Sequence, residues 1–164
     1  MPDASPNLRY YRPLVGRWAG DFDLTVRDLY ALSRTSLLTR LVGLAARLSG
    51  RARMATTLAE LAPDRFHHTT RVRSLGLALL RSDETITLDG DGRGFVIEGW
   101  QQLLWRREAY RGTGTITADA QGAHYALTWL GAPLDQTTRI EAGGLLLTQR
   151  TAWSWGRVLL VRQP

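Results

Sequence analysis

The chain has 164 residues, a formal net charge of +6, 44% hydrophobic residues and no cysteine. This length and hydrophobic content are enough for one domain with a sizeable core. The missing cysteines exclude disulfides, thiolate metal sites and cysteine nucleophiles. All 21 basic residues are arginine, which excludes lysine bases and Schiff-base mechanisms.

The first element is an alternating strand over about residues 17–27. From Trp18 to Val26, Phe22 and Leu24 alternate with Asp21 and Asp23, and a period of two predicts a half-buried strand. The strand opens with Gly-x-Trp, and this motif resembles the signature of the calycin barrels: lipocalins, fatty-acid-binding proteins and their bacterial lipocalin-like relatives. The resemblance implies an up-and-down barrel around one small-molecule cavity, with Trp18 plugging one end.

Two further segments flank this strand. Residues 1–13 form an N-terminal arm whose two tyrosines, Tyr10 and Tyr11, are expected to pack across the barrel floor. Residues 29–49 carry leucines at three- and four-residue spacing with arginines between them, which predicts an amphipathic helix that ends at Gly50. In fatty-acid-binding proteins a helical segment at this place forms a lid over the cavity mouth. We expect the apolar stripe to face the mouth and Leu41 to contact the ligand; the stripe consists of Leu37, Leu41, Leu44 and Leu48. Basic amphipathic helices also bind membrane surfaces and partner proteins, so that alternative stays open.

The remaining chain predicts a series of short strands with short turns. Turn signals such as Asp89-Gly90-Asp91-Gly92 and Gly143-Gly144 separate them, and this spacing favours a meander over a sandwich. The expected strands are 52–61, 65–74, 77–89, 93–102, 106–118, 122–130, 134–142, 144–154 and 156–162. The predicted fold is therefore all-β: a single up-and-down antiparallel barrel of about 8–10 strands, with the helical lid inserted after the first strand and residues 1–164 as one domain.

Alternation also predicts which titratable side chains face the cavity. His68 and Glu84 share faces with apolar neighbours and are expected to point inward. In 94–102 both faces are partly apolar, and we assign the face with Glu98 and Trp100 to the interior. A carboxyl among apolar side chains has a raised pKa and can act as a general acid. Glu84, Glu98 and His68 are therefore candidate catalytic residues; a structural ion pair or a Glu–Arg contact that closes the barrel is the alternative.

Aromatic residues form the second candidate site. Five of the six tryptophans lie in the second half of the chain, which favours an aromatic-walled cavity for a flat or polyene-like ligand, with an ordinary aromatic core as the alternative. Alternation places Tyr110, Tyr125, Trp129, Trp153 and Trp155 on inward faces. The predicted ligand-binding residues are Phe22, Leu41, Trp100, Tyr110, Tyr125, Trp129 and Trp153.

No cofactor or metal is expected. His67, His68 and His124 lack metal-ligand spacing, and the chain has no dinucleotide, phosphate-loop or nucleophile-elbow motif. Haem-binding members of the lipocalin-like group use a histidine late in the barrel, whereas no histidine follows His124. Fatty-acid-binding proteins hold the ligand carboxylate with a C-terminal Arg-x-Tyr, and the segment 157–162 has no tyrosine. Neither of these family sites carries over to this chain.

The sequence thus predicts a protein that binds a hydrophobic small molecule, aromatic or polyene-like and of polyketide or terpenoid type. The alternative is a cofactor-independent cyclase or isomerase that folds its substrate and uses acid–base catalysis. A basic protein that binds nucleic acid or a partner is the third alternative, although the arginines are dispersed among 15 acidic residues. The polar N-terminus and the absence of cysteine from the chain predict a cytoplasmic protein. No apolar run reaches the roughly 20 residues of a membrane span.

Overall fold

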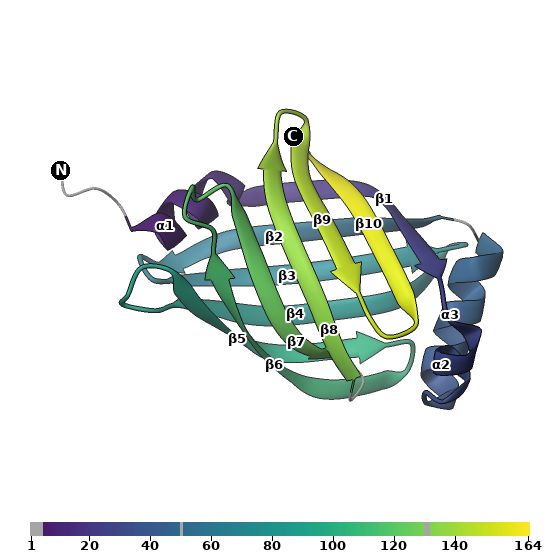
Figure 1. The fold of residues 1–164 in the computed structure, drawn as a ribbon. Coiled ribbons are helices and arrows are strands. Elements are labelled where there is room, and N and C mark those ends of the chain that lie inside the picture. Colours follow the sequence, from purple (N-terminus) through teal and green to yellow (C-terminus); the bar gives the residue numbers. More distant parts are fainter. Residues whose placement is uncertain (1–4, 50, 130–131) are drawn as a thin grey trace.

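Ten antiparallel strands close into a barrel in the computed structural model, which describes residues 5–49, 51–129 and 132–164 (Figure 1). Each strand pairs with its neighbours in sequence, and β1 closes the ring by pairing with β10. This is the up-and-down meander with a helical lid that the sequence predicts. The strands are β1 (Gly16–Val26), β2 (Ala52–Ala62), β3 (Arg65–Ser74), β4 (Leu77–Leu88), β5 (Gly94–Leu103), β6 (Arg106–Ile116), β7 (Gly122–Trp129), β8 (Ala132–Glu141), β9 (Gly144–Arg150) and β10 (Ser154–Arg162).

One end of the barrel is filled by the segment before β1, here called the floor: helix α1 (Pro6–Tyr11) and the 3-10 turn η1 (Arg12–Leu14) (Figure 1). Tyr10 and Tyr11 are both fully buried. The Tyr11 ring stacks on Phe66 at 5.3 Å between ring centroids and meets the edge of Phe95 at 5.5 Å. The Asn7 N–H donates to the Gly92 carbonyl at 2.9 Å. These contacts fix the floor against strands that lie far from it in the sequence.

The other end is covered by the lid, helices α2 (Leu29–Ser33) and α3 (Leu37–Ser49) (Figure 1). Asp28 caps α2 by accepting from the Ala31 N–H at 2.9 Å, as short polar side chains do at helix N-termini. Leu38 and Val42 are buried and pack with Leu103 of β5. Of the described residues, none belongs to a helix long and apolar enough to cross a membrane.

The orientation predicted for the leucine stripe of α3 is wrong. Leu37, Leu41 and Leu44 are 67%, 41% and 47% exposed, and the side chain of Leu48 lies outside the described part of the chain. Leucines occur around most of this helix, so their spacing alone does not select the buried side. Gly43 selects it: a Cβ there would lie 2.9 Å from Leu32 and 3.3 Å from Trp153. Because Gly43 has no side chain, α3 packs closely against Leu32 of α2 and against Trp153 at this point. The side of the helix with Leu38 and Val42 is then the buried one.

Candidate functional site

A cavity of about 170 Å³ lies inside the barrel between the floor and the lid. Its wall is mostly aliphatic and aromatic, with Phe22 and Leu24 from β1, Leu147 from β9 and Val42 from the lid among the lining residues. Two groups of polar side chains are hydrogen-bonded among themselves, one on the wall formed by β2–β6 and one next to the floor. The amides of Gln136 and Gln149 also line the cavity. The arrangement is a mainly apolar container with separate places for hydrogen bonding.

The wall group is a row of residues in register across four strands. His68 of β3 lies beside Glu84 of β4, then Gly99 of β5, then Tyr110 of β6. A Cβ at Gly99 would lie 2.6 Å from the Glu84 Cα, so only glycine fits between these strands. Gly99 also leaves the space between Glu84 and Tyr110 free of a side chain. Burial and the Glu84 charge raise the pKa of the Tyr110 phenol, which therefore stays neutral.

His68 uses both ring nitrogens. Nδ1 is hydrogen-bonded to Glu84 Oε1, and Nε2 lies 2.5 Å from Thr56 Oγ1. The Thr56 hydroxyl is also within hydrogen-bond distance of the Thr69 carbonyl, at 2.9 Å, and the tautomer of His68 decides which group donates between Nε2 and Thr56. The side chains of His68 and Glu84 both line the cavity, and this pair is able to give a proton to a bound molecule or take one from it.

The floor group consists of phenols. Tyr10 Oη is hydrogen-bonded to the Thr138 hydroxyl, and Thr138 Oγ1 lies 3.5 Å from Tyr125 Oη. Burial raises the pKa values of Tyr10, Tyr11 and Tyr125, so all three are neutral hydrogen-bond donors at neutral pH. Tyr11 Oη is the one buried polar side-chain atom of the described residues without a hydrogen-bond partner.

The predicted interior positions of His68, Glu84, Phe22, Tyr110 and Tyr125 agree with the residues that line the cavity. Whether these residues bind or transform a ligand stays a prediction. His67, which alternation assigns to the outer face, pairs there with Asp83 at 3.0 Å. Among the described residues no three histidine or carboxylate side chains converge on a point that suits a metal ion.

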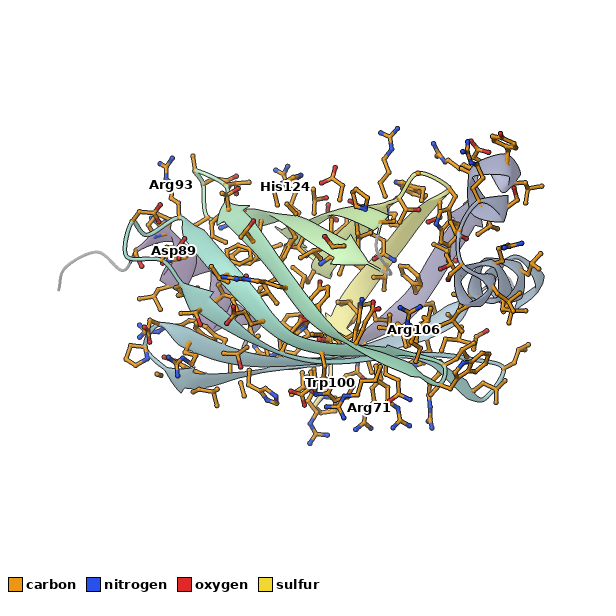
Figure 2. All side chains as sticks on the ribbon, turned by 90° about the horizontal axis from the view of Figure 1, so that it is seen from below. Arg71, Asp89, Arg93, Trp100, Arg106 and His124 are labelled. Carbon is orange, nitrogen blue, oxygen red and sulfur yellow. The ribbon has the colours of Figure 1, made fainter. Side chains whose placement is uncertain are left out.

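The face predicted for β5 is wrong. Glu98 is on the outer surface and pairs with Arg111 at 3.2 Å between Oε1 and Nε. The Trp100 ring also faces outward, with the Arg107 guanidinium 3.9 Å from its centroid, and Figure 2 shows it pointing away from the barrel. The interior face instead carries Phe95 and Ile97, which are 1% and 2% exposed. Burial of Phe95 and Ile97 stabilises the barrel more than burial of Trp100 alone would. The outward Trp100 ring is in turn partly covered by the Arg107 guanidinium.

Two other predicted ligand contacts, Leu41 and Trp153, also change, and so does the inward orientation predicted for Trp155. Leu41 is exposed on the lid. Trp153 is buried, but it packs beneath Gly43 of the lid and is not among the residues that line the cavity. The predicted strand 144–154 ends at Arg150 because Thr151 Oγ1 accepts from the Ser154 N–H at 3.0 Å and forms a turn; after this turn Trp155 faces outward beneath Arg27. The side chain of Trp129 lies outside the described residues.

Sequence reasoning missed the threonines of the site, Thr56 and Thr138, and the unpartnered hydroxyl of Tyr11. Thr56 shares an alternating face with Met54 and Leu58 on β2, and this pattern was sufficient to place it inside. Tyr11 was expected to pack on the floor, but no sequence pattern shows that its hydroxyl lacks a partner, because that depends on the spacing of several strands and a helix.

Comparisons with known proteins bear on the fold alone. No family model and no curated protein matches the chain. The crystal structure of Rv2717c from M. tuberculosis is similar with a TM-score of 0.63 and 14% identity, over 99% of this chain and 100% of that one. A point mutant of the fluorescent protein UnaG has a TM-score of 0.53 and 12% identity, over 94% and 99%. The REP1-NXSQ fatty acid transporter has a TM-score of 0.44 and 11% identity, over 93% and 97%. At such identities the similarity concerns the barrel architecture and not the ligand.

Proposed function

We propose that this calycin-type barrel binds an apolar small molecule in the cavity between the floor and the lid. The cavity itself carries the proposal. Most of the side chains that line its volume of about 170 Å³ are apolar, so a ligand that fills it buries apolar surface of its own and of the wall. Burial of this surface is the driving force that we expect for binding.

The volume favours a compact ligand. Pockets for drug-sized molecules span roughly 300–1,000 Å³, whereas this cavity measures about 170 Å³. A small terpenoid therefore fits better than an extended polyene or a polycyclic polyketide, which would need the lid to move outward. Val42 lines the cavity from the lid, so a displacement of α3 changes the space available at that end.

The proposal is tested by a variant that fills the cavity and a control on the next residue. Val72 of β3 is half-buried and lines the cavity, while Arg71 points outward (Figure 2). Native mass spectrometry should detect a small molecule, retained from the cell or added as a terpenoid mixture, on the wild type and on Arg71→Trp. Val72→Trp should lose it while the circular dichroism spectrum stays unchanged. Equal ligand retention by all three proteins would place any bound molecule outside the cavity.

A second function on the same site is favoured by the His68–Glu84 contact. A proton taken by this pair from a carbon next to a ligand carbonyl, and returned to another carbon of the same molecule, gives an isomer without any co-reactant. The wall group supplies the acid–base pair. The Tyr110 phenol, two strands away from Glu84, is a neutral hydrogen-bond donor for the enolate oxygen.

This second function has an assay that needs no natural substrate. Citronellal in heavy water should take up deuterium next to its carbonyl faster with the wild type than with Glu84→Gln or His68→Ala. Loss of a general acid or base typically lowers a rate by about 10²–10⁴. If all three proteins bind citronellal and exchange deuterium at the same rate, proton transfer by His68 and Glu84 is excluded.

A further inference from the structure

Charged side chains are almost absent from the residues that line the cavity. Of the 21 arginines in the chain, none is among the described residues that line the cavity. The ionisable side chains there other than phenols are His68 and Glu84, and each is already the hydrogen-bond partner of the other. A ligand that arrives with its own negative charge therefore meets one carboxyl group and no free cation.

An ionised head group is poorly accommodated under these conditions. A carboxylate removed from water needs a cation or several hydrogen-bond donors to offset its lost hydration. His68 already directs its Nδ1 to Glu84 and its Nε2 to Thr56. A carboxylic acid would therefore enter in its protonated form, which at neutral pH is less than about one hundredth of the total, given an ordinary carboxyl pKa near 4–5.

The floor offers a different kind of contact. Tyr11 is 2% exposed and lines the cavity, and no group in the described ranges meets its Oη in hydrogen-bond geometry. The adjacent Tyr10 hydroxyl is bonded to Thr138. Besides burial, the Tyr125 hydroxyl is close enough to raise the pKa of the Tyr11 phenol through its charge and a hydrogen-bonding contribution, but it does not meet Tyr11 Oη in hydrogen-bond geometry. Buried hydroxyls are almost always partnered, and a buried polar group without a partner costs about 1–3 kcal/mol. A neutral phenol donor in the floor of an apolar cavity is suited to an oxygen atom supplied by the ligand.

We infer that the ligand is an uncharged apolar molecule with a carbonyl or hydroxyl oxygen that accepts a hydrogen bond from Tyr11 Oη at the floor, and that carboxylates are disfavoured. This inference rests on the proposed binding function and specifies its substrate class. It also sets the direction of binding: the oxygen end lies at the floor and the hydrocarbon end lies toward the lid.

Four probes of one carbon skeleton separate these contributions: β-citronellene, citronellol, citronellal and citronellic acid. They differ in the head group alone, and their volatility allows binding to be measured by headspace partitioning. The wild type should bind the aldehyde or the alcohol about three- to tenfold more tightly than the hydrocarbon, as expected for one neutral hydrogen bond. It should bind the acid at least about a hundredfold more weakly than the aldehyde at neutral pH. This gap should narrow as the pH falls toward the pKa of the free acid.

Tyr11→Phe tests the assignment of the oxygen contact, with Tyr30→Phe as its control because Tyr30 is exposed on the lid. Tyr11→Phe should remove the advantage of the aldehyde and alcohol and leave β-citronellene binding unchanged, whereas Tyr30→Phe should change nothing. If the hydrocarbon binds but the acid binds most tightly, or if Tyr11→Phe preserves the advantage, the head-group inference is wrong while the binding function stands. If none of the four probes binds, the proposed function itself fails.

Discussion

Alkaline pH should unfold this protein through its buried tyrosines. Burial raises the pKa values of Tyr10, Tyr11, Tyr110 and Tyr125. In the unfolded chain these phenols lose their protons near pH 10, whereas in the folded protein they keep them. Above this pH the unfolded state binds fewer protons than the folded state, so stability is complete below about pH 10 and falls as the pH rises further.

The magnitude follows from the number of phenols. Each phenol that is protonated in the folded state but ionised in the unfolded state lowers the free energy of unfolding by about 1.4 kcal/mol per pH unit. Four such groups give a slope of up to about 5 kcal/mol per pH unit above the unfolded pKa. A domain with an ordinary stability of about 5–15 kcal/mol should therefore unfold within roughly one to three pH units of that value. The chain has no lysine or cysteine, and arginine stays protonated, so no other side chain masks the effect.

The assay combines urea unfolding at successive pH values above about 9 with near-ultraviolet absorbance of tyrosinate. Tyrosinate formation by the four buried phenols should coincide with the loss of the β-sheet circular dichroism signal. Tyr11→Phe should reduce the slope of stability against pH by about a quarter. Ionisation of all five tyrosines near pH 10 in a protein that keeps its fold would refute the burial of these hydroxyls.

Three further predictions concern stability and use urea unfolding at neutral pH. Tyr10→Phe should cost about 1–2 kcal/mol because it removes a buried hydrogen bond, whereas Tyr11→Phe should be neutral or slightly stabilising because its hydroxyl has none; equal losses would mean that Tyr11 has an undetected partner. Leu38→Ala should cost about 2–4 kcal/mol and Leu44→Ala less than about 1 kcal/mol, and the reverse order would restore the leucine stripe as the buried face of the lid. Trp18→Ala should cost about 3 kcal/mol, since the half-buried ring lines the cavity and its Nε1 donates to a floor carbonyl at 2.8 Å; an unchanged midpoint would remove it from this structural role.

The barrel and half of the candidate site follow from the sequence because most strands have one clearly apolar face. On β3 and β4 alternation places His68 and Glu84 inside, and on β6 and β7 it places Tyr110 and Tyr125 there. Since successive side chains on a strand point to opposite faces, one correct apolar residue fixes the orientation of all the others on that strand.

The orientation predictions that failed concern elements where that condition does not hold. β5 carries large apolar residues on both faces, so the choice between Ile97 and Trp100 depended on packing and not on pattern. Helix α3 has leucines on most sides, and its buried face is determined by contact at Gly43 with Leu32. The unpartnered hydroxyl of Tyr11 results from the distances between elements, which no local pattern records.

The position of a bound ligand tests the central claim most directly. Nuclear Overhauser contacts between citronellal and selectively labelled methyl groups show which side chains surround the ligand. We expect contacts to Ile86 and Ile97 inside the barrel, with the aldehyde end closest to the Tyr11 ring. Contacts confined to the exposed Leu37 and Leu44 of the lid would contradict the account, because the ligand would then bind the outer surface of the helix and not the cavity.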